Sequence, residues 1–154
     1  MITMREMKER WETLDLQQEG ANVINESQQN QETISELNRE QLTKGLNKEG
    51  EKLRKYYDKG YAEMKEGMNP IPGYGNPDLK LTGDFYDSFE TIADREDITI
   101  TATDEKTSML IEKYNKSGGD IFGLSSESID VVREDILHPG LVANIADKTG
   151  CEIG

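Results

Sequence analysis

The sequence has little of what metal sites and nucleophilic enzymes use. It contains one cysteine, Cys151, and one histidine, His138, in 154 residues. A single thiol excludes a disulfide within the chain, and a structural zinc site needs about four nitrogen or sulfur ligands. A Cys–His catalytic pair would also need a third group that orients the base. We therefore expect no metal and no cofactor, and we predict that the chain is not an enzyme.

Long apolar runs are also missing. Apolar residues make up 34% of the chain and charged residues 32%. The longest apolar runs are only a few residues, so we expect no membrane-spanning helix and no membrane partner. The core is expected to be small for this length, with much of the chain facing water or another protein.

Positive charge is scarce. The chain has 18 basic and 31 acidic residues, a net charge of −13. Residues 70–154 hold 17 acids against 7 bases, a net of −10. Phosphate backbones repel such a surface, so we expect no sequence-specific nucleic-acid binding. A surface of this kind suits a basic protein partner or the wall of a conduit.

The carboxylates leave one enzymatic alternative open. A small hydrolase could use a pair of them, one protonated and one ionised. Most of the candidates lie at predicted turns or helix caps, where a carboxylate accepts backbone N–H groups. They are Asp84, Asp87, Glu90, Asp94, Glu96, Asp97, Asp104 and Glu105.

No proline precedes Pro70, and residues 4–48 are rich in Glu, Gln, Leu, Lys and Arg, which favours helix. We expect two helices or one long bent helix, with a break in the polar stretch 25–32. The apolar residues of the whole segment 4–48 form a narrow stripe, which predicts that the helical region contacts a partner along one line. We therefore predict that residues 1–50 form an extended polar helical arm. Its contact residues would be Leu16, Val23, Ile34 and Leu37.

The rest of the chain predicts a compact α+β domain over 51–146, containing a Pro/Gly loop at 69–77, and a flexible tail over 147–154. Ile98, Ile100 and Ala102 alternate with threonines, which predicts a half-buried strand that follows a hairpin turn at 94–97.

Helices should follow that strand. One is expected after Asp104, and another should be capped by Ser125 or Ser126 and broken at Pro139-Gly140. A last short helix would contain Leu141 and Ile145. The expected fold class is α+β: a long N-terminal helix, a small antiparallel hairpin, and C-terminal helices packed on it.

One element resembles a known family. Residues 79–89, LKLTGDFYDSF, are similar to the TG-x-(L/F)-x-x-S-(I/F) element of small neck and tail-completion proteins of tailed phages. Together with the later IFGLS, the stretch resembles proteins of crAss-like and related Bacteroidetes-infecting phages. The resemblance spans residues 40–146. The chain departs from the family in its long polar N-terminal region, and it lacks the acidic-glycine turn that often follows the family's strand.

The resemblance implies a structural virion protein, assembled in the host cytoplasm. It would be a head–tail connector ring or tail-completion subunit between the portal and the tail. Such rings are homo-oligomers, often twelvefold, that contact the portal and other neck or tail proteins while DNA passes through a central channel. The contact residues in this element would be Thr82, Phe85, Tyr86 and Phe89. The alternative is a soluble adaptor or regulatory protein that acts as a coiled-coil dimer.

Overall fold

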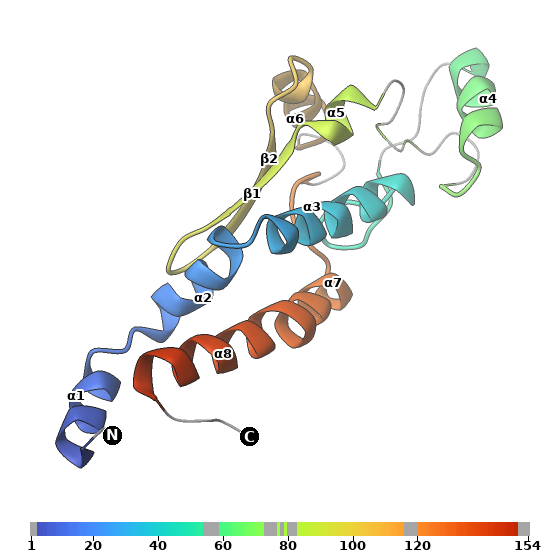
Figure 1. The fold of residues 1–154 in the computed structure, drawn as a ribbon. Coiled ribbons are helices and arrows are strands. Elements are labelled where there is room, and N and C mark those ends of the chain that lie inside the picture. Colours follow the sequence, from blue (N-terminus) through green and yellow to red (C-terminus); the bar gives the residue numbers. More distant parts are fainter. Residues whose placement is uncertain are drawn as a thin grey trace.

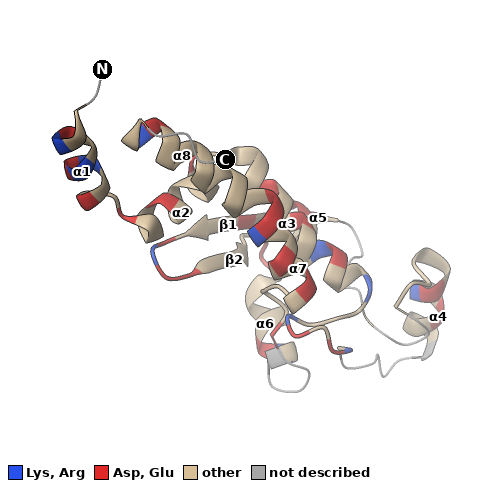
Figure 2. Ribbon diagram, turned by 90° about the horizontal axis from the view of Figure 1, so that it is seen from below, with Lys and Arg blue, Asp and Glu red and all other residues tan. Residues whose placement is uncertain are grey.

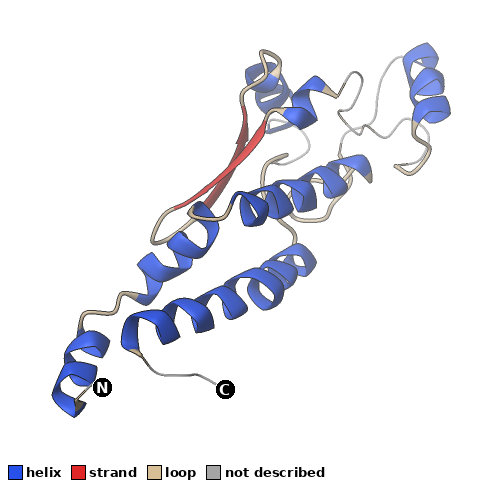
Figure 3. Ribbon diagram, viewed as in Figure 1, coloured by secondary structure: helices blue, strands red, loops and turns tan. Residues whose placement is uncertain are grey.

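The computed structural model describes residues 3–53, 59–72, 77, 79, 83–115 and 120–150. The predicted α+β class is confirmed: among the described residues, helices pack on one face of an antiparallel two-stranded sheet (Figures 1 and 3). The elements in chain order are α1 (Met4–Glu12), α2 (Leu16–Asn25), α3 (Gln28–Thr43), α4 (Lys59–Met68), α5 (Asp84–Asp87), β1 (Phe89–Ala93), β2 (Ile98–Ala102), α6 (Thr107–Asn115), α7 (Ser126–Val131), the π-helical stretch η1 (Val132–Leu137) and α8 (His138–Thr149).

The N-terminal region forms three helices, so the prediction of one long or two helices was wrong. The side chain of Asp15 accepts a hydrogen bond from the Gln18 N–H and starts α2. Ser27 does the same for the Asn30 N–H and starts α3. The second break lies inside the stretch 25–32, where one was predicted. The break between α1 and α2 was not predicted, because a single N-cap residue is enough to begin a new helix.

Residues 16–43 are part of the core rather than an extended arm. Helix α2 contacts α3, α8 and β1, and α3 packs on β1. Buried apolar side chains from both helices join one cluster with residues of the hairpin and the C-terminal helices. This cluster includes Ala21, Val23, Ile24, Ile34, Leu42, Phe85, Phe89, Ile100, Val132 and Ile136.

Buried amide side chains explain why a polar segment packs inside. Asn38 donates to the Ile121 carbonyl over 3.0 Å and accepts from the Gly123 N–H over 3.0 Å. Gln41 donates to the Gly123 carbonyl over 3.1 Å and accepts from the Ser125 N–H over 2.8 Å. An amide can be buried at little cost when its donor and its acceptor are both paired.

The hairpin matches the prediction. Strands β1 and β2 are antiparallel, with Ala93 opposite Ile98 and Phe89 opposite Ala102. In the turn, the Asp94 carboxylate accepts the N–H groups of Asp97 and Glu96 over 2.7 and 2.8 Å. These hydrogen bonds, the one from Asp97 foremost, hold the pKa of Asp94 below its ordinary value.

The C-terminal helices run on through Pro139-Gly140, so the predicted break there was wrong. Ser125 caps α7 as predicted, and η1 connects α7 directly to α8. In η1 the His138 N–H bonds the Arg133 carbonyl, five residues back. A π turn shifts the pairing by one residue, and this places Pro139 in the first turn of α8, where its missing N–H is tolerated.

Gly140 lies where α8 crosses α2, and the two helices run side by side in Figure 1. A Cβ atom at Gly140 would lie 2.8 Å from Cγ2 of Val23, closer than carbon atoms approach. The glycine thus permits a close helix crossing rather than ending a helix. The same helix extends to Thr149, which is fully buried, so the predicted tail boundary at 147 is too early. Cys151 lies outside the described residues.

Candidate binding groove

Two adjoining hollows lie along α3 and the strand β1, and they share Glu32. The first has a volume of about 370 Å³ and is lined by Glu32, Glu36, Arg39, Thr43, Tyr86 and Asp87. The second has a volume of about 310 Å³ and is lined by Gln28, Gln31, Glu32, Ser35, Phe89, Glu90, Thr91 and Ile92. We call the two together the α3–β1 groove.

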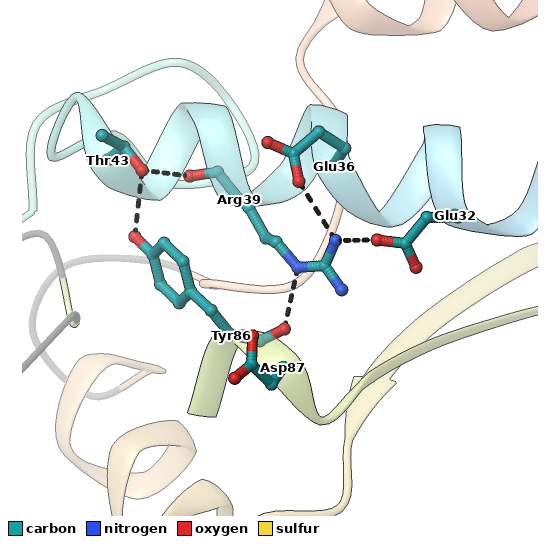
Figure 4. A pocket seen from close by; sticks show the side chains of 6 residues that line it. All are labelled: Glu32, Glu36, Arg39, Thr43, Tyr86 and Asp87. Atoms are coloured by element: carbon teal, nitrogen blue, oxygen red, sulfur yellow. Dashed lines mark hydrogen bonds and ion pairs between the residues drawn. The ribbon is translucent and has the colours of Figure 1, made fainter. Parts of the chain in front are cut away.

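Arg39 is the fixed centre of the first hollow (Figure 4). Its Nε donates to the Tyr86 carbonyl over 2.8 Å. Its Nη1 bonds the carboxylates of Glu32 and Glu36, the latter over 3.1 Å. The guanidinium carbon also lies 5.4 Å from the centre of the Phe89 ring. Contacts on three sides therefore hold this side chain in one position.

The charge of Arg39 is stabilised by its partners. Burial of the guanidinium acts to lower its pKa, but the hydrogen bonds that it donates to Glu32 and Glu36 outweigh this and raise the pKa above its ordinary value. Arg39 therefore stays charged at every physiological pH. The two glutamates are more than half exposed at their side chains, so they also face water and any partner that enters the groove.

The far wall of the first hollow is formed by Tyr86 and Thr43. Tyr86 is buried, and its hydroxyl lies 3.4 Å from Oγ1 of Thr43. The Thr43 hydroxyl also donates to the Arg39 carbonyl over 2.9 Å. Asp87 presents its carboxylate beside this wall (Figure 4). The hollow is thus built from side chains of α3 and α5, with Arg39 and Tyr86 buried and the carboxylates exposed.

The groove as a whole is acidic. Four carboxylates line it, those of Glu32, Glu36, Asp87 and Glu90, against the single guanidinium of Arg39, which leaves a net charge of −3. Acidic residues along α3 are visible in Figure 2. A groove with this balance attracts a cation such as a lysine or arginine side chain and repels a phosphate.

The second hollow lies at the outer edge of β1. It is lined by four consecutive strand residues, Phe89 to Ile92. Phe89 and Thr91 are on the buried face of the sheet, whereas Glu90 and Ile92 are on the exposed face. Only a space at the edge of a strand can meet residues from both faces, because successive side chains point to opposite sides.

The pairing within the hairpin shows which backbone groups point outward. The Asp94 N–H bonds the Asp97 carbonyl over 2.9 Å, and the Thr103 N–H bonds the Ser88 carbonyl over 3.2 Å. Bonded and non-bonded pairs alternate along an antiparallel ladder. It follows that the N–H and C=O groups of Phe89, Thr91 and Ala93 point away from β2.

One of these three residues is already paired. The Asn25 side chain donates to the Ala93 carbonyl over 2.6 Å and accepts from the Ala93 N–H over 2.9 Å. Within the described part of the chain, no hydrogen bond reaches the outward backbone groups of Phe89 or Thr91. The edge of β1 is therefore paired at Ala93 and unpaired at Phe89 and Thr91, which are 6% and 4% exposed and are reached only through the second hollow.

The structure gives a different account of the contact residues predicted from the sequence. Val23, Ile34, Phe85, Tyr86 and Phe89 are each at most 7% exposed, so their side chains belong mainly to the core. Tyr86 and Phe89 also line the groove. These five side chains pack together in the core cluster, which is the physical reason for the correction.

Of the other three predicted contact residues, two lie in the described part of the chain. Leu37 packs partly buried against the core, and Leu16 is 55% exposed. Thr82 lies outside the described residues. Leu16, Val23 and Leu37 are spaced by multiples of seven residues, as in a coiled coil, but they fall on two separate helices and do not form one seam.

Sequence reasoning missed the α3 residues of the groove, although it named Tyr86 and Phe89 as contact residues and Asp87 and Glu90 among the carboxylates. Glu32, Glu36 and Arg39 follow one another at helical spacings of four and three, which was a usable signal for one charged face. The role of Asn25 had no local signal, because its partner Ala93 lies 68 positions away.

The described residues also bear on metal binding and on membrane insertion. Among those residues, no three side chains of His, Cys, Asp or Glu are grouped so that they could hold a metal ion. No helix in the same ranges has both the length and the apolar character needed to cross a membrane.

Comparisons of the chain with protein-family models, with curated proteins and with solved structures find no match. The resemblance to phage neck proteins therefore stays a prediction, and the groove has to be interpreted from its own chemistry.

Proposed function

We propose that the chain is an assembly protein that holds a basic segment of another protein subunit in the α3–β1 groove. The observation that carries this proposal is the groove's net charge of −3 around a fixed Arg39, beside an open strand edge. A lysine or arginine side chain gains from the carboxylates without displacing Arg39, because Arg39 is held by its own partners. The open edge offers further hydrogen bonds that only a peptide backbone would match well.

The assembly that we propose is the neck of a tailed phage. This part rests on the resemblance of residues 79–89 to neck and tail-completion proteins. In that setting the chain is a virion subunit in a homo-oligomeric ring, and its partners are the portal and other neck or tail proteins. The basic segment would belong to one of these neighbours.

The groove is tested with variants that remove charge without disturbing Arg39. Asp87→Asn with Glu90→Gln takes two negative charges from the groove and leaves the bonds of Arg39 to Glu32 and Glu36 in place. Glu9→Gln with Glu12→Gln makes the same change in net charge on the exposed helix α1. The probe is a fluorescent five-residue peptide, Thr-Lys-Val-Lys-Thr, at low ionic strength.

We expect the groove variant to bind the peptide roughly tenfold more weakly, from the loss of about 1.4 kcal/mol of electrostatic attraction. The α1 variant should bind as the wild type does. Equal weakening in both variants would show that only total charge matters, and it would overturn the groove as the binding site.

The neck assignment has its own test. Light scattering on the purified chain, 17.4 kDa as a monomer, should give either a ring or a monomer that joins a portal ring when the two are mixed. A stable dimer that ignores portal and tail proteins would contradict the neck assignment and leave the groove proposal standing.

A further inference from the structure

We infer that the partner's segment binds the α3–β1 groove by strand addition, as a third, antiparallel strand beside β1. This inference rests on the proposed function and specifies how the basic segment is held. The segment pairs through its backbone with the outward groups of Thr91 and Phe89 and ends where Asn25 occupies Ala93.

The edge of β1 is suited to a short added strand. Two residues at alternate positions, Phe89 and Thr91, each offer one N–H and one C=O to an incoming backbone. An unpaired strand edge of this kind is a template for another chain. The hollow beside it provides about 310 Å³ for that chain, between the strand and α3. Asn25 already makes, at the next outward position, the pair of hydrogen bonds that a strand residue would make.

Charge and alternation together define the sequence of the segment. Residues directly opposite Phe89 and Thr91 would share their face of the sheet, which is the face that α3 covers. Side chains there extend toward α3, where Glu32 lines both hollows and Glu36 the first. A residue opposite Glu90 would lie on the outer face beside Ile92, which is 59% exposed. The expected pattern is basic, apolar, basic.

A second copy of the chain does not fit this groove equally well. The other open strand, β2, has the sequence ITITA, which contains no basic residue. Its ends are flanked by Asp97 and Asp104, so pairing β2 with the groove would bring carboxylates together. Charge complementarity therefore favours a separate basic segment over self-association through this edge.

The experiment uses the full chain and three forms of the peptide Thr-Lys-Val-Lys-Thr. In an antiparallel third strand, the N–H groups of the two lysines point toward β1 and the valine N–H points away. The first form is unmodified, the second is N-methylated at both lysines, and the third is N-methylated at valine. All three carry the same charges.

The unmodified and valine-methylated peptides should bind with similar affinity, and the lysine-methylated peptide at least tenfold more weakly. Amide hydrogen exchange of Thr91 and Phe89 should slow at least tenfold when the unmodified peptide is bound. If all three forms bind equally and both amides stay unprotected, strand addition is wrong and the acidic groove remains a charge-based site. If none binds, the proposed function fails as well.

Discussion

The side-chain amide of Asn25 pairs with the backbone of Ala93 through two hydrogen bonds, as a residue of a neighbouring strand would. It thereby covers the end of β1 nearest the hairpin turn. The open part of the edge is limited to the two outward positions before it. We predict that the position of this one side chain limits the length of segment that the groove accepts.

Replacing Asn25 with alanine should lengthen the open edge. The variant leaves the Ala93 N–H and C=O without partners, so we expect a loss of about 1 kcal/mol in the free energy of unfolding. Exchange of the Ala93 amide should become faster, and a seven-residue peptide that extends the same alternation should gain affinity over the five-residue one. Asn22→Ala, on the same helix, is the matched control. An unchanged exchange rate at Ala93 would refute the capping role.

The crossing of α2 and α8 predicts a penalty at Gly140. A Cβ there would clash with Val23, so Gly140→Ala should lower the free energy of unfolding by about 1–2 kcal/mol despite the better helix propensity of alanine. Adding Val23→Ala should relieve the clash, which urea unfolding would show as a double variant less unstable than the two single losses combined. Gly20→Ala, with nothing within 4 Å, should be neutral or stabilising. A stabilising Gly140→Ala would show that the helices do not cross this closely.

Asn38 should be among the most sensitive positions in α3. Asn38→Ala would leave the Ile121 carbonyl and the Gly123 N–H unpaired in a buried place. We expect a loss of about 2–4 kcal/mol, measured by chemical unfolding. Gln29→Ala on the exposed face of the same helix should change stability by less than about 0.5 kcal/mol. A similar small effect for both would mean that the amide of Asn38 does not anchor residues 121–125.

The pair of Lys148 with the buried Glu19 predicts a stability effect at alkaline pH. The hydrogen bond that Lys148 donates to Glu19 is the main cause that raises the pKa of Lys148. A raised pKa in the folded state means that the stabilisation is complete below the ordinary lysine pKa of about 10.4 and is lost as the pH rises through the folded-state value.

Lys148→Met removes the pair and leaves the Glu19 carboxylate buried without a cation. We expect this variant to be less stable than the wild type at pH 7, and the difference between the two should shrink above about pH 10.4. Lys8→Met, which breaks an exposed pair with Glu12, is the control and should show little effect at either pH. A difference that stays constant with pH would mean that the ion pair does not stabilise the fold.

The local structure that could be predicted from the sequence is the part governed by neighbouring residues. The hairpin followed from the alternation of Ile98, Ile100 and Ala102 with threonines, and its turn from the acidic stretch at 94–97. The cap at Ser125 likewise depends on residues within one turn. The helix break predicted at Pro139 was wrong because the π-helical stretch before it changes the backbone hydrogen bonding. No local sequence pattern indicated that stretch.

The packing of the N-terminal half and the groove were not predictable in the same way. A polar composition suggested an exposed arm, but Asn38 and Gln41 are buried and pair with the backbone of residues more than 80 positions away. Arg39 is likewise paired with the carbonyl of Tyr86, 47 positions away. Local periodicity does not identify such distant partners, because several other amide or charged side chains of the chain could have made the same hydrogen bonds.

The central claim is tested most directly by a magnetic-resonance titration of the isotope-labelled full chain with Thr-Lys-Val-Lys-Thr at low ionic strength. We predict that the shifted amide signals concentrate in two stretches, residues 28–36 of α3 and residues 86–92 of α5 and β1, with Thr91 among the largest changes. Saturating shifts centred elsewhere, or no shifts at all at millimolar peptide, would contradict the assignment of this groove as the protein-binding site.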